Sequence, residues 1–318
     1  MLKILSMLSL ILLSPSKLFG NALKFESIQH SQVTVSPDIV GVLAYRDRVY
    51  ETPFNNNYLI SSAYNPKPKK DGFAFGDKYS DTAGTDRIIF PKHIKKGYWH
   101  GLASYGENIL LMEGRKKKIL RFKPETKRFI GYSEIILDLF RPALDSRGEP
   151  TKNEITNGRR NFIRELKKLD SGVIALNGLA EFPQAWVKGS GQASHLIATG
   201  IPKFPLFTMK CSSKDGLVCQ LKRQCFLEGH KKVAHGLAVS AKRRQILRVD
   251  RENHQLLVYK WMKCHHIPLV GRIKLPAKLN KARNLYIDSS DNLWVSTEKP
   301  DNYRNSSLYK WAAKDWGL

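Results

Sequence analysis

The sequence predicts an all-β protein, a β-propeller of about six four-stranded blades. Two observations lead to this fold. A short phrase, His100-Gly101-Leu102-Ala103, recurs 235 − 100 = 135 residues later as His235-Gly236-Leu237-Ala238. Short runs of β-branched and aromatic residues also alternate with Gly, Asn, Asp and Ser, which is typical of an antiparallel meander. Because one small sheet cannot bury both of its faces, repeats of this size pack against one another around a ring.

The first 22 residues are predicted to be a signal peptide. Lys3 precedes an apolar stretch, Ile4 to Leu13, that is too short to span a bilayer, and Gly20-Asn21-Ala22 has the small-x-small pattern of a cleavage site. Cleavage there would leave 318 − 22 = 296 residues, without a later apolar run of membrane length. We expect residues 23–318 to form one secreted or periplasmic propeller domain with no transmembrane segment.

Four segments share a layout of short strand, polar turn, apolar strand, longer polar loop and third strand. They begin at Gly101, Arg164, Gly236 and Arg283. Their apolar second strands are expected at Ile109 to Met112, Val173 to Leu176, Ile246 to Val249 and Leu293 to Ser296. Dividing 296 residues by about 48 per blade predicts six blades, with five and seven as alternatives, and places the two histidine phrases three repeats apart. Residues 138–160 are then an inserted loop.

The last repeat, which ends at Trp311, contains only three recognisable strands. A propeller needs a fourth strand in that blade to close its ring. We expect the segment from Lys24 to Val35, with its β-branched residues, to supply that strand.

The cysteines favour an oxidising compartment. All four follow the signal segment, and they predict disulfides whose pairing has three possible patterns. A zinc cluster is the alternative, but the spacings fit no C-x2-C knuckle. The four candidates are Cys211, Cys219, Cys225 and Cys264.

The net charge of the chain indicates which kind of partner the protein attracts. Fifty-three Lys and Arg residues against 28 Asp and Glu residues give a formal net charge of +25. Such a charge attracts polyanions. For an exported protein, we expect an anionic small molecule, a polysaccharide or an envelope component rather than nucleic acid.

The segment from Gly236 to Trp261, "GLAVSAKRRQILRVDRENHQLLVYKW", resembles a propeller repeat of the NHL type. It is also similar to repeats of the gluconolactonase and senescence-marker-protein propellers. In a propeller the first strand of each blade lines the central channel, so its first residue points at the channel mouth. The four aligned positions are His100, Arg164, His235 and Arg283.

The preferred functional hypothesis is an anion-binding site at the mouth of the central channel. Guanidinium groups pair with carboxylate or phosphate, and neutral imidazoles nearby remain hydrogen-bond donors. Arg164 and Arg283 would be the clamps, with His100 and His235 beside them, and Trp99 could stack on a sugar or base. The structural alternative is that these side chains only bond neighbouring blades.

The alternative hypothesis is that the protein is a metal-dependent hydrolase or lyase that acts at the propeller axis. The His-Gly-Leu-Ala phrases resemble the His-Ser-Leu-Ala repeats of the propeller lyase that cleaves peptidyl-hydroxyglycine, which implies zinc at His100 and His235. A lactonase-like or esterase-like site would instead hold a divalent cation such as calcium within a polar ring. That ring would be Glu113, Asn177 and Asp250, whose alternative role is to cap the following turns.

Overall fold

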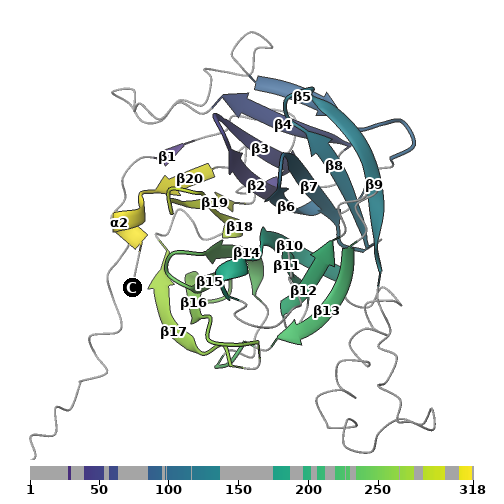
Figure 1. The fold of residues 1–318 in the computed structure, drawn as a ribbon. Helices are drawn as coiled ribbons and strands as arrows, with labels where there is room; N and C mark the ends of the chain where they lie inside the picture. The colour runs from purple at the N-terminus through teal and green to yellow at the C-terminus, as the bar shows by residue number, and fades with distance from the viewer. Residues whose placement is uncertain are drawn as a thin grey trace, which may run out of the picture.

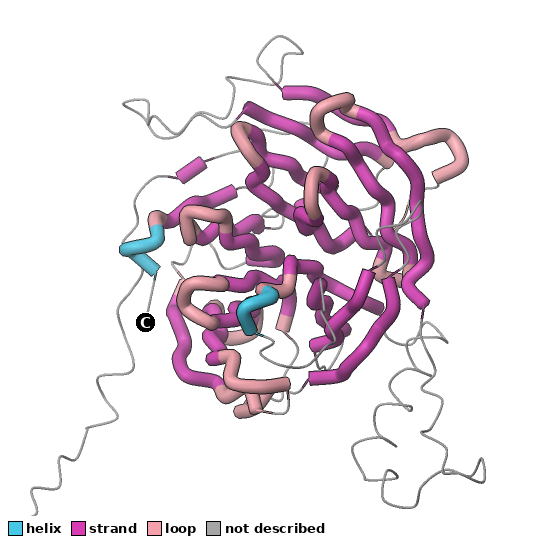
Figure 2. The backbone as a smooth tube through the Cα atoms, viewed as in Figure 1, coloured by secondary structure: helices cyan, strands magenta, loops and turns pink. Residues whose placement is uncertain are grey.

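A computed structural model of the chain shows strands arranged around a ring (Figure 1). The structure describes residues 28–29, 39–53, 57–63, 85–94, 97, 99–115, 117–136, 175–186, 196–201, 206–211, 219–225, 227–229, 234–264, 266–275, 282–297 and 308–316. The predicted signal peptide, the predicted inserted loop at 138–160 and Arg164 lie outside these residues. Apart from a 3-10 turn at Gln184–Trp186 and helix α2 (Ala313–Trp316), the elements described are strands (Figure 2).

The strands form five four-stranded blades. Blade 1 consists of β2 (Ile39–Tyr45), β3 (Arg48–Pro53), β4 (Tyr58–Ala63) and β5 (Thr85–Ile89), and blade 2 of β6 (Trp99–Tyr105), β7 (Asn108–Glu113), β8 (Lys118–Lys123) and β9 (Arg128–Ile136). Blade 3 consists of β10 (Ala175–Glu181), β11 (Leu196–Ile201), β12 (Leu206–Cys211) and β13 (Cys219–Cys225), and blade 4 of β14 (His235–Ser240), β15 (Gln245–Asp250), β16 (Gln255–Lys260) and β17 (Leu269–Lys274). Blade 5 contains β18 (Ala282–Ile287), β19 (Leu293–Thr297), β20 (Leu308–Trp311) and β1 (Ile28–Gln29).

The prediction of a β-propeller is confirmed, but the prediction of six blades is wrong. Residues 64–84 separate β4 from β5, and residues 137–174 separate β9 from β10, so chain length overestimates the number of repeats. The two histidine phrases consequently lie two blades apart, in β6 and β14, rather than three.

The ring closes through the N-terminal strand, as the sequence predicts. Strand β1 pairs antiparallel with β20, with Ile28 opposite Tyr309 and Gln29 opposite Leu308. The first described strand therefore completes the last blade, and backbone hydrogen bonds join the two ends of the chain.

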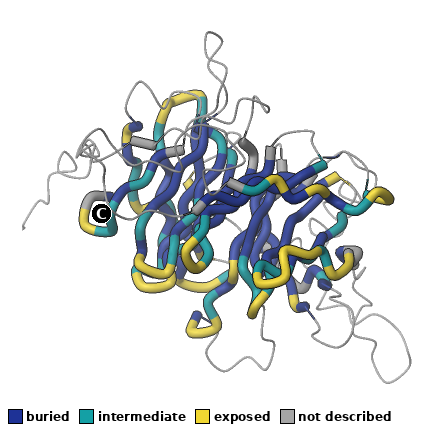
Figure 3. The backbone as a smooth tube through the Cα atoms, turned by 90° about the horizontal axis from the view of Figure 1, so that it is seen from above, coloured by how far each residue is buried: buried dark blue, intermediate teal, exposed yellow. Residues whose placement is uncertain are grey.

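The inner strands β2, β6, β10, β14 and β18 contact one another in this order, and β18 contacts β2. Side chains between adjacent blades form the core, in which buried positions run along the middle of the strands and exposed positions lie at the turns (Figure 3). One such cluster contains Leu110, Met112, Leu179, Ala198 and Phe207 from blades 2 and 3. Burial of the sheet faces between blades is the main source of stability in this fold.

The four cysteines form two disulfides, and the structure resolves the pairing that the sequence left open. Cys211 and Cys219 face each other on β12 and β13, and Cys225 bonds Cys264, which follows β16 in the next blade. The zinc alternative for these residues is thereby excluded. The second disulfide links blades 3 and 4 beside a β-bridge between Leu227 and Ile267. Two disulfides are compatible with an extracytoplasmic protein. Within the described ranges, none of the helices has the length and apolar character needed to cross a membrane.

Candidate functional site

Each inner strand begins with an irregular pairing to the second strand of its blade. The register shifts between Ile39 and Gly41, Trp99 and Gly101, Leu176 and Leu179, His235 and Ala238, and Ala282 and Asn284. A bulge turns one residue out of the regular alternation, which re-aims its side chain. The same irregularity therefore recurs at the first residues of all five inner strands. We call this end of the ring, where the five inner strands begin, the strand-head mouth.

Strand β10 corrects the sequence alignment. The sequence predicts a second strand at Val173 to Leu176, but β10 is the inner strand of blade 3 and carries the phrase Asn177-Gly178-Leu179-Ala180. Asn177 therefore occupies the head position that was assigned to Arg164, and it is not a member of a ring at second-strand ends. The third copy of the Gly-Leu-Ala phrase was the signal that could have identified this strand.

The glycine of the phrase allows adjacent inner strands to approach closely. A Cβ on Gly101 would lie 2.6 Å from Cβ of Leu179 in the next blade, and a Cβ on Gly178 would lie 2.9 Å from Cβ of Leu237. Gly178 and Gly236 also have positive φ values of 112° and 60°, which favour glycine. The repeated phrase is therefore explained first by packing, because a side chain at Gly101 or Gly178 would collide with the neighbouring inner strand.

Close approach brings polar strand-head residues together. The side-chain amide of Asn177 and Nδ1 of His235 lie 3.5 Å apart, between blades 3 and 4. The amide of Asn284, next to Arg283, donates a hydrogen bond of 3.3 Å to the backbone carbonyl of His100. His100 is 6% exposed and Asn177 is 4% exposed, whereas His235 and Arg283 are half-buried.

Both histidines are neutral at pH 7. The pKa of His100 is lowered to about 3, chiefly by burial and then by the positive charge of Arg283, with smaller contributions from His235 and Arg115. Burial also lowers the pKa of His235 to about 4, with contributions from Arg251, Arg248 and Arg283. Arg283 acts on both imidazoles, so the two histidines and this arginine belong to one electrostatic environment.

Three further arginines surround the strand-head mouth, and sequence reasoning did not select them. Arg115 follows β7 and is exposed, while Arg251 follows β15 and is half-buried. Arg248, within β15, is 3% exposed and donates a hydrogen bond to the carbonyl of Ala234, and burial lowers its pKa to about 10. These arginines come from second strands, so only the three-dimensional arrangement places them beside the histidines.

The remaining predicted site residues have structural positions. Trp99 is 4% exposed and packs edge-to-face on Phe90 at 5.2 Å, so its ring belongs to the core and does not present a stacking surface. Asp250 accepts hydrogen bonds from the backbone of Asn253 and from the side chains of Asn253 and Gln255, and thereby caps its turn. Glu113 is buried at the end of β7, beside Gly97.

The structure does not assemble the predicted metal sites within the part of the chain that it describes. There, no group of three or more His, Cys, Asp or Glu side chains has a geometry that could hold a metal ion. A zinc site needs at least three protein ligands, and His100 and His235 supply two. The three residues of the proposed cation ring do not occupy one repeated position of the blades, because Asn177 lies at a strand head whereas Glu113 and Asp250 end second strands.

Comparison with known proteins identifies the fold. No protein-family model matches the chain, and neither does any curated protein. Among solved structures, the glutaminyl cyclase of Myxococcus xanthus is similar with a TM-score of 0.50 and 10% identity, over 90% of this chain and 93% of that chain. A calcium-binding regucalcin from Agrobacterium tumefaciens has a TM-score of 0.47 and 7% identity, over 92% and 95%. A luciferin-regenerating enzyme has a TM-score of 0.44 and 9% identity, over 92% and 78%. The chain shares the β-propeller fold, as its resemblance to NHL and gluconolactonase repeats implied.

Proposed function

We propose that this protein is an exported β-propeller that binds an anionic ligand, or the anionic group of a glycan or partner, at the strand-head mouth. The observation that carries the proposal is the convergence of Arg283 with His100, Asn177 and His235 from four different blades. The bound group would be a carboxylate, sulfate or phosphate.

The side chains of the mouth are hydrogen-bond donors. Arg283 supplies a planar guanidinium group, which suits the paired oxygens of a carboxylate or phosphate. If the Asn177 amide donates to Nδ1 of His235, the proton of the neutral imidazole lies on Nε2 and can be donated to a ligand. Together they offer an anion both charge and directed hydrogen bonds.

The concentration of positive charge at the mouth also favours an anion. The lowered pKa values of His100 and His235 reflect repulsion by Arg283 in addition to burial. A bound anion would offset this repulsion, so part of the electrostatic cost of assembling the mouth would be recovered on binding. Without Lys3 and Lys17 of the signal peptide the net charge is 51 − 28 = +23, which would also raise the rate at which anions reach the protein.

A pair of charge-matched variants tests the proposal. Arg283→Gln removes a guanidinium from the mouth, whereas Arg272→Gln removes one from β17, the outer strand of blade 4. Isothermal titration with inorganic phosphate, citrate and a heparin oligosaccharide should show at least one ligand whose Kd rises about tenfold or more in Arg283→Gln, and less than about twofold in Arg272→Gln. Equal losses in the two variants would mean that the net charge alone attracts the ligand, and would refute a defined site.

Export is tested separately. We propose that residues 1–22 direct secretion, in agreement with the two disulfides. The mature protein recovered from a secreting host should begin at Leu23, as determined by N-terminal sequencing. Retention of the intact N-terminus in the cytoplasm would contradict this part of the proposal and leave the anion test unaffected.

A further inference from the structure

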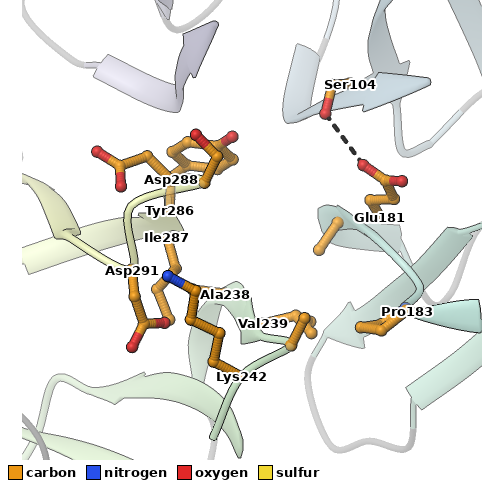
Figure 4. A pocket seen from close by; sticks show the side chains of 13 residues that line it. Ser104, Glu181, Pro183, Ala238, Val239, Lys242, Tyr286, Ile287, Asp288 and Asp291 are labelled. Atoms are coloured by element: carbon orange, nitrogen blue, oxygen red, sulfur yellow. Dashed lines mark hydrogen bonds between the residues drawn. The ribbon is translucent and has the colours of Figure 1, made fainter. Parts of the chain in front are cut away.

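A second mouth lies at the opposite ends of the inner strands and contains a pocket of about 320 Å³ (Figure 4). Its walls come from the ends of β6, β10, β14 and β18 and from the turns that follow them. Ser104 is four residues beyond His100 in β6, which corresponds to roughly 13 Å at about 3.3 Å per residue. The pocket is therefore distinct from the strand-head mouth. Its volume suits a small organic molecule.

Most of the polar atoms that line this pocket are engaged within the protein. The carboxylate of Asp288 accepts hydrogen bonds from Asn292, from the backbone of Ser290 and from the indole of Trp294. The carboxylate of Asp291 accepts a hydrogen bond from Ser240 and forms an ion pair with Arg243 at 2.6 Å. These two aspartates hold the turn between β18 and β19, so they shape the wall of the pocket.

Glu181 differs from the two aspartates. It is exposed at the end of β10, and its carboxylate accepts one side-chain hydrogen bond, from Ser104 at 3.3 Å, as Figure 4 shows. Burial and then the negative charges of Asp288 and Glu181 raise the pKa of Tyr286. The carboxylates thus impose a negative potential on the phenol ring, in a protein whose net charge is strongly positive.

Apart from Lys242 and Ser289, the other residues that line the pocket are apolar or aromatic. Pro183, Ala238, Val239 and Ile287 line the pocket, together with Tyr286. Proteins bind organic ammonium groups in pockets that combine apolar walls, an aromatic ring and an available carboxylate. We propose that this pocket binds a small organic ammonium ion with an apolar body, with Glu181 as its counter-ion and Tyr286 as part of its wall.

Lys242 sets the selectivity of the pocket. It lies on the turn after β14, where it is exposed and makes no hydrogen bond or ion pair with the described residues. Its charge would repel a cation in the pocket. The repulsion is weaker for a cation that Glu181 holds against the opposite wall, because that cation lies farther from Lys242. Removal of this charge should therefore strengthen the binding of an ammonium ion, whereas a carboxylate ligand would lose affinity.

The structure supplies its own probes for the test. Three indole N–H groups donate hydrogen bonds to residues of the pocket: Trp186 to the carbonyl of Ala241, Trp294 to the carboxylate of Asp288, and Trp316 to the carbonyl of Asp291. The chain has six tryptophans, so the indole signals of 15N-tryptophan-labelled protein are few enough to resolve. Trp99, in the core between blades 1 and 2, is the internal reference.

Titration with phenethylammonium should shift the indole signals of Trp294 and Trp316 but not that of Trp99. The Kd should rise at least about fivefold in Glu181→Gln and fall in Lys242→Gln. Glu107→Gln is the matched control, because Glu107 is an exposed carboxylate on the turn after β6, at the same end of the molecule, and should change the Kd less than about twofold. The proposal is overturned if phenethylammonium shifts no pocket signal, if Glu181→Gln and Glu107→Gln behave alike, or if 3-phenylpropionate binds more tightly.

Discussion

The side-chain amide of Asn284 donates a hydrogen bond to the backbone carbonyl of His100 across the ring, although β18 and β6 are not adjacent inner strands. The two residues are 184 positions apart in the chain and 3.3 Å apart in space. Strand β2 lies between their blades in ring order. This bond therefore connects blades 5 and 2 directly at the strand-head mouth.

Replacement of Asn284 by alanine should destabilise the protein by about 2 kcal/mol. The change removes the donor to His100 and also the acceptor for the backbone N–H of Leu285, both of which are buried. Urea denaturation measures the free energy of unfolding. Ser289→Ala, at an exposed position of the same blade, is the control and should be nearly neutral. A loss no larger than that of the control would show that the bond between Asn284 and His100 contributes nothing.

The glycine of the first His-Gly-Leu-Ala phrase should tolerate no side chain. In Gly101→Ala the new Cβ would lie 2.6 Å from Cβ of Leu179 and 3.0 Å from its backbone nitrogen, so blades 2 and 3 must separate. We expect a loss of about 3 kcal/mol or more in the free energy of unfolding.

Gly106→Ala is the informative comparison. At Gly106 φ is 57°, and nothing lies within 4 Å of the added Cβ, so only backbone strain of about 1 kcal/mol applies. Thermal and urea denaturation of both variants separate packing from conformation. Equal effects in the two variants would contradict the close-approach explanation of the repeated phrase.

The two disulfides should differ in their contribution to stability. Cys225 and Cys264 close a separation of 39 residues between blades 3 and 4, whereas Cys211 and Cys219 close a separation of 8 residues within one hairpin. Chain-entropy arguments give the longer link about 1 kcal/mol more. The double alanine variant of Cys225 and Cys264 should therefore have the lower free energy of unfolding in non-reducing urea. The reverse order would show that packing around the shorter link outweighs loop closure.

The strand-head histidines should make the protein less stable as the pH falls. The pKa of His100 is about 3 and that of His235 about 4 in the folded protein, against 6.5 for an unperturbed imidazole. The unfolded chain therefore binds protons from pH 6.5 downward that the folded state does not bind. The contribution to stability is fully present above pH 6.5 and is lost as the pH falls toward the folded pKa, by up to about 1.4 kcal/mol per pH unit for each histidine.

Urea denaturation between pH 7.5 and 4 measures this slope. Replacement of His100 by glutamine should make the dependence shallower, because one of the two groups no longer titrates. The exposed His93 lies on the turn after β5, and His93→Gln is the control for the loss of an imidazole. Identical pH slopes for His100→Gln and the unmodified protein would contradict the assignment of His100 as a buried neutral base.

Local sequence patterns predicted the strands wherever strand and turn signals alternate at short intervals. The second strands of blades 2, 4 and 5 were placed correctly at Ile109 to Met112, Ile246 to Val249 and Leu293 to Ser296. The prediction failed at Val173 to Leu176, where a long connection precedes the blade and hides the phase of the repeat. The prediction of the number of blades failed for the same reason, because an average spacing cannot distinguish a long connection from a blade.

Sequence by itself determined the β-propeller, the closing strand at the N-terminus and the candidacy of His100, His235 and Arg283, because these depend on local periodicity and on a repeated phrase. Tertiary structure alone decided the number of blades, the pairing of the cysteines, the place of Asn177 and the nearness of Arg115, Arg248 and Arg251 to the histidines. It also decided that the far ends of the inner strands form a pocket lined by Glu181, Asp288 and Asp291. The physical reason is ring closure, which sets residues from distant strands side by side, a proximity that spacing along the chain does not encode.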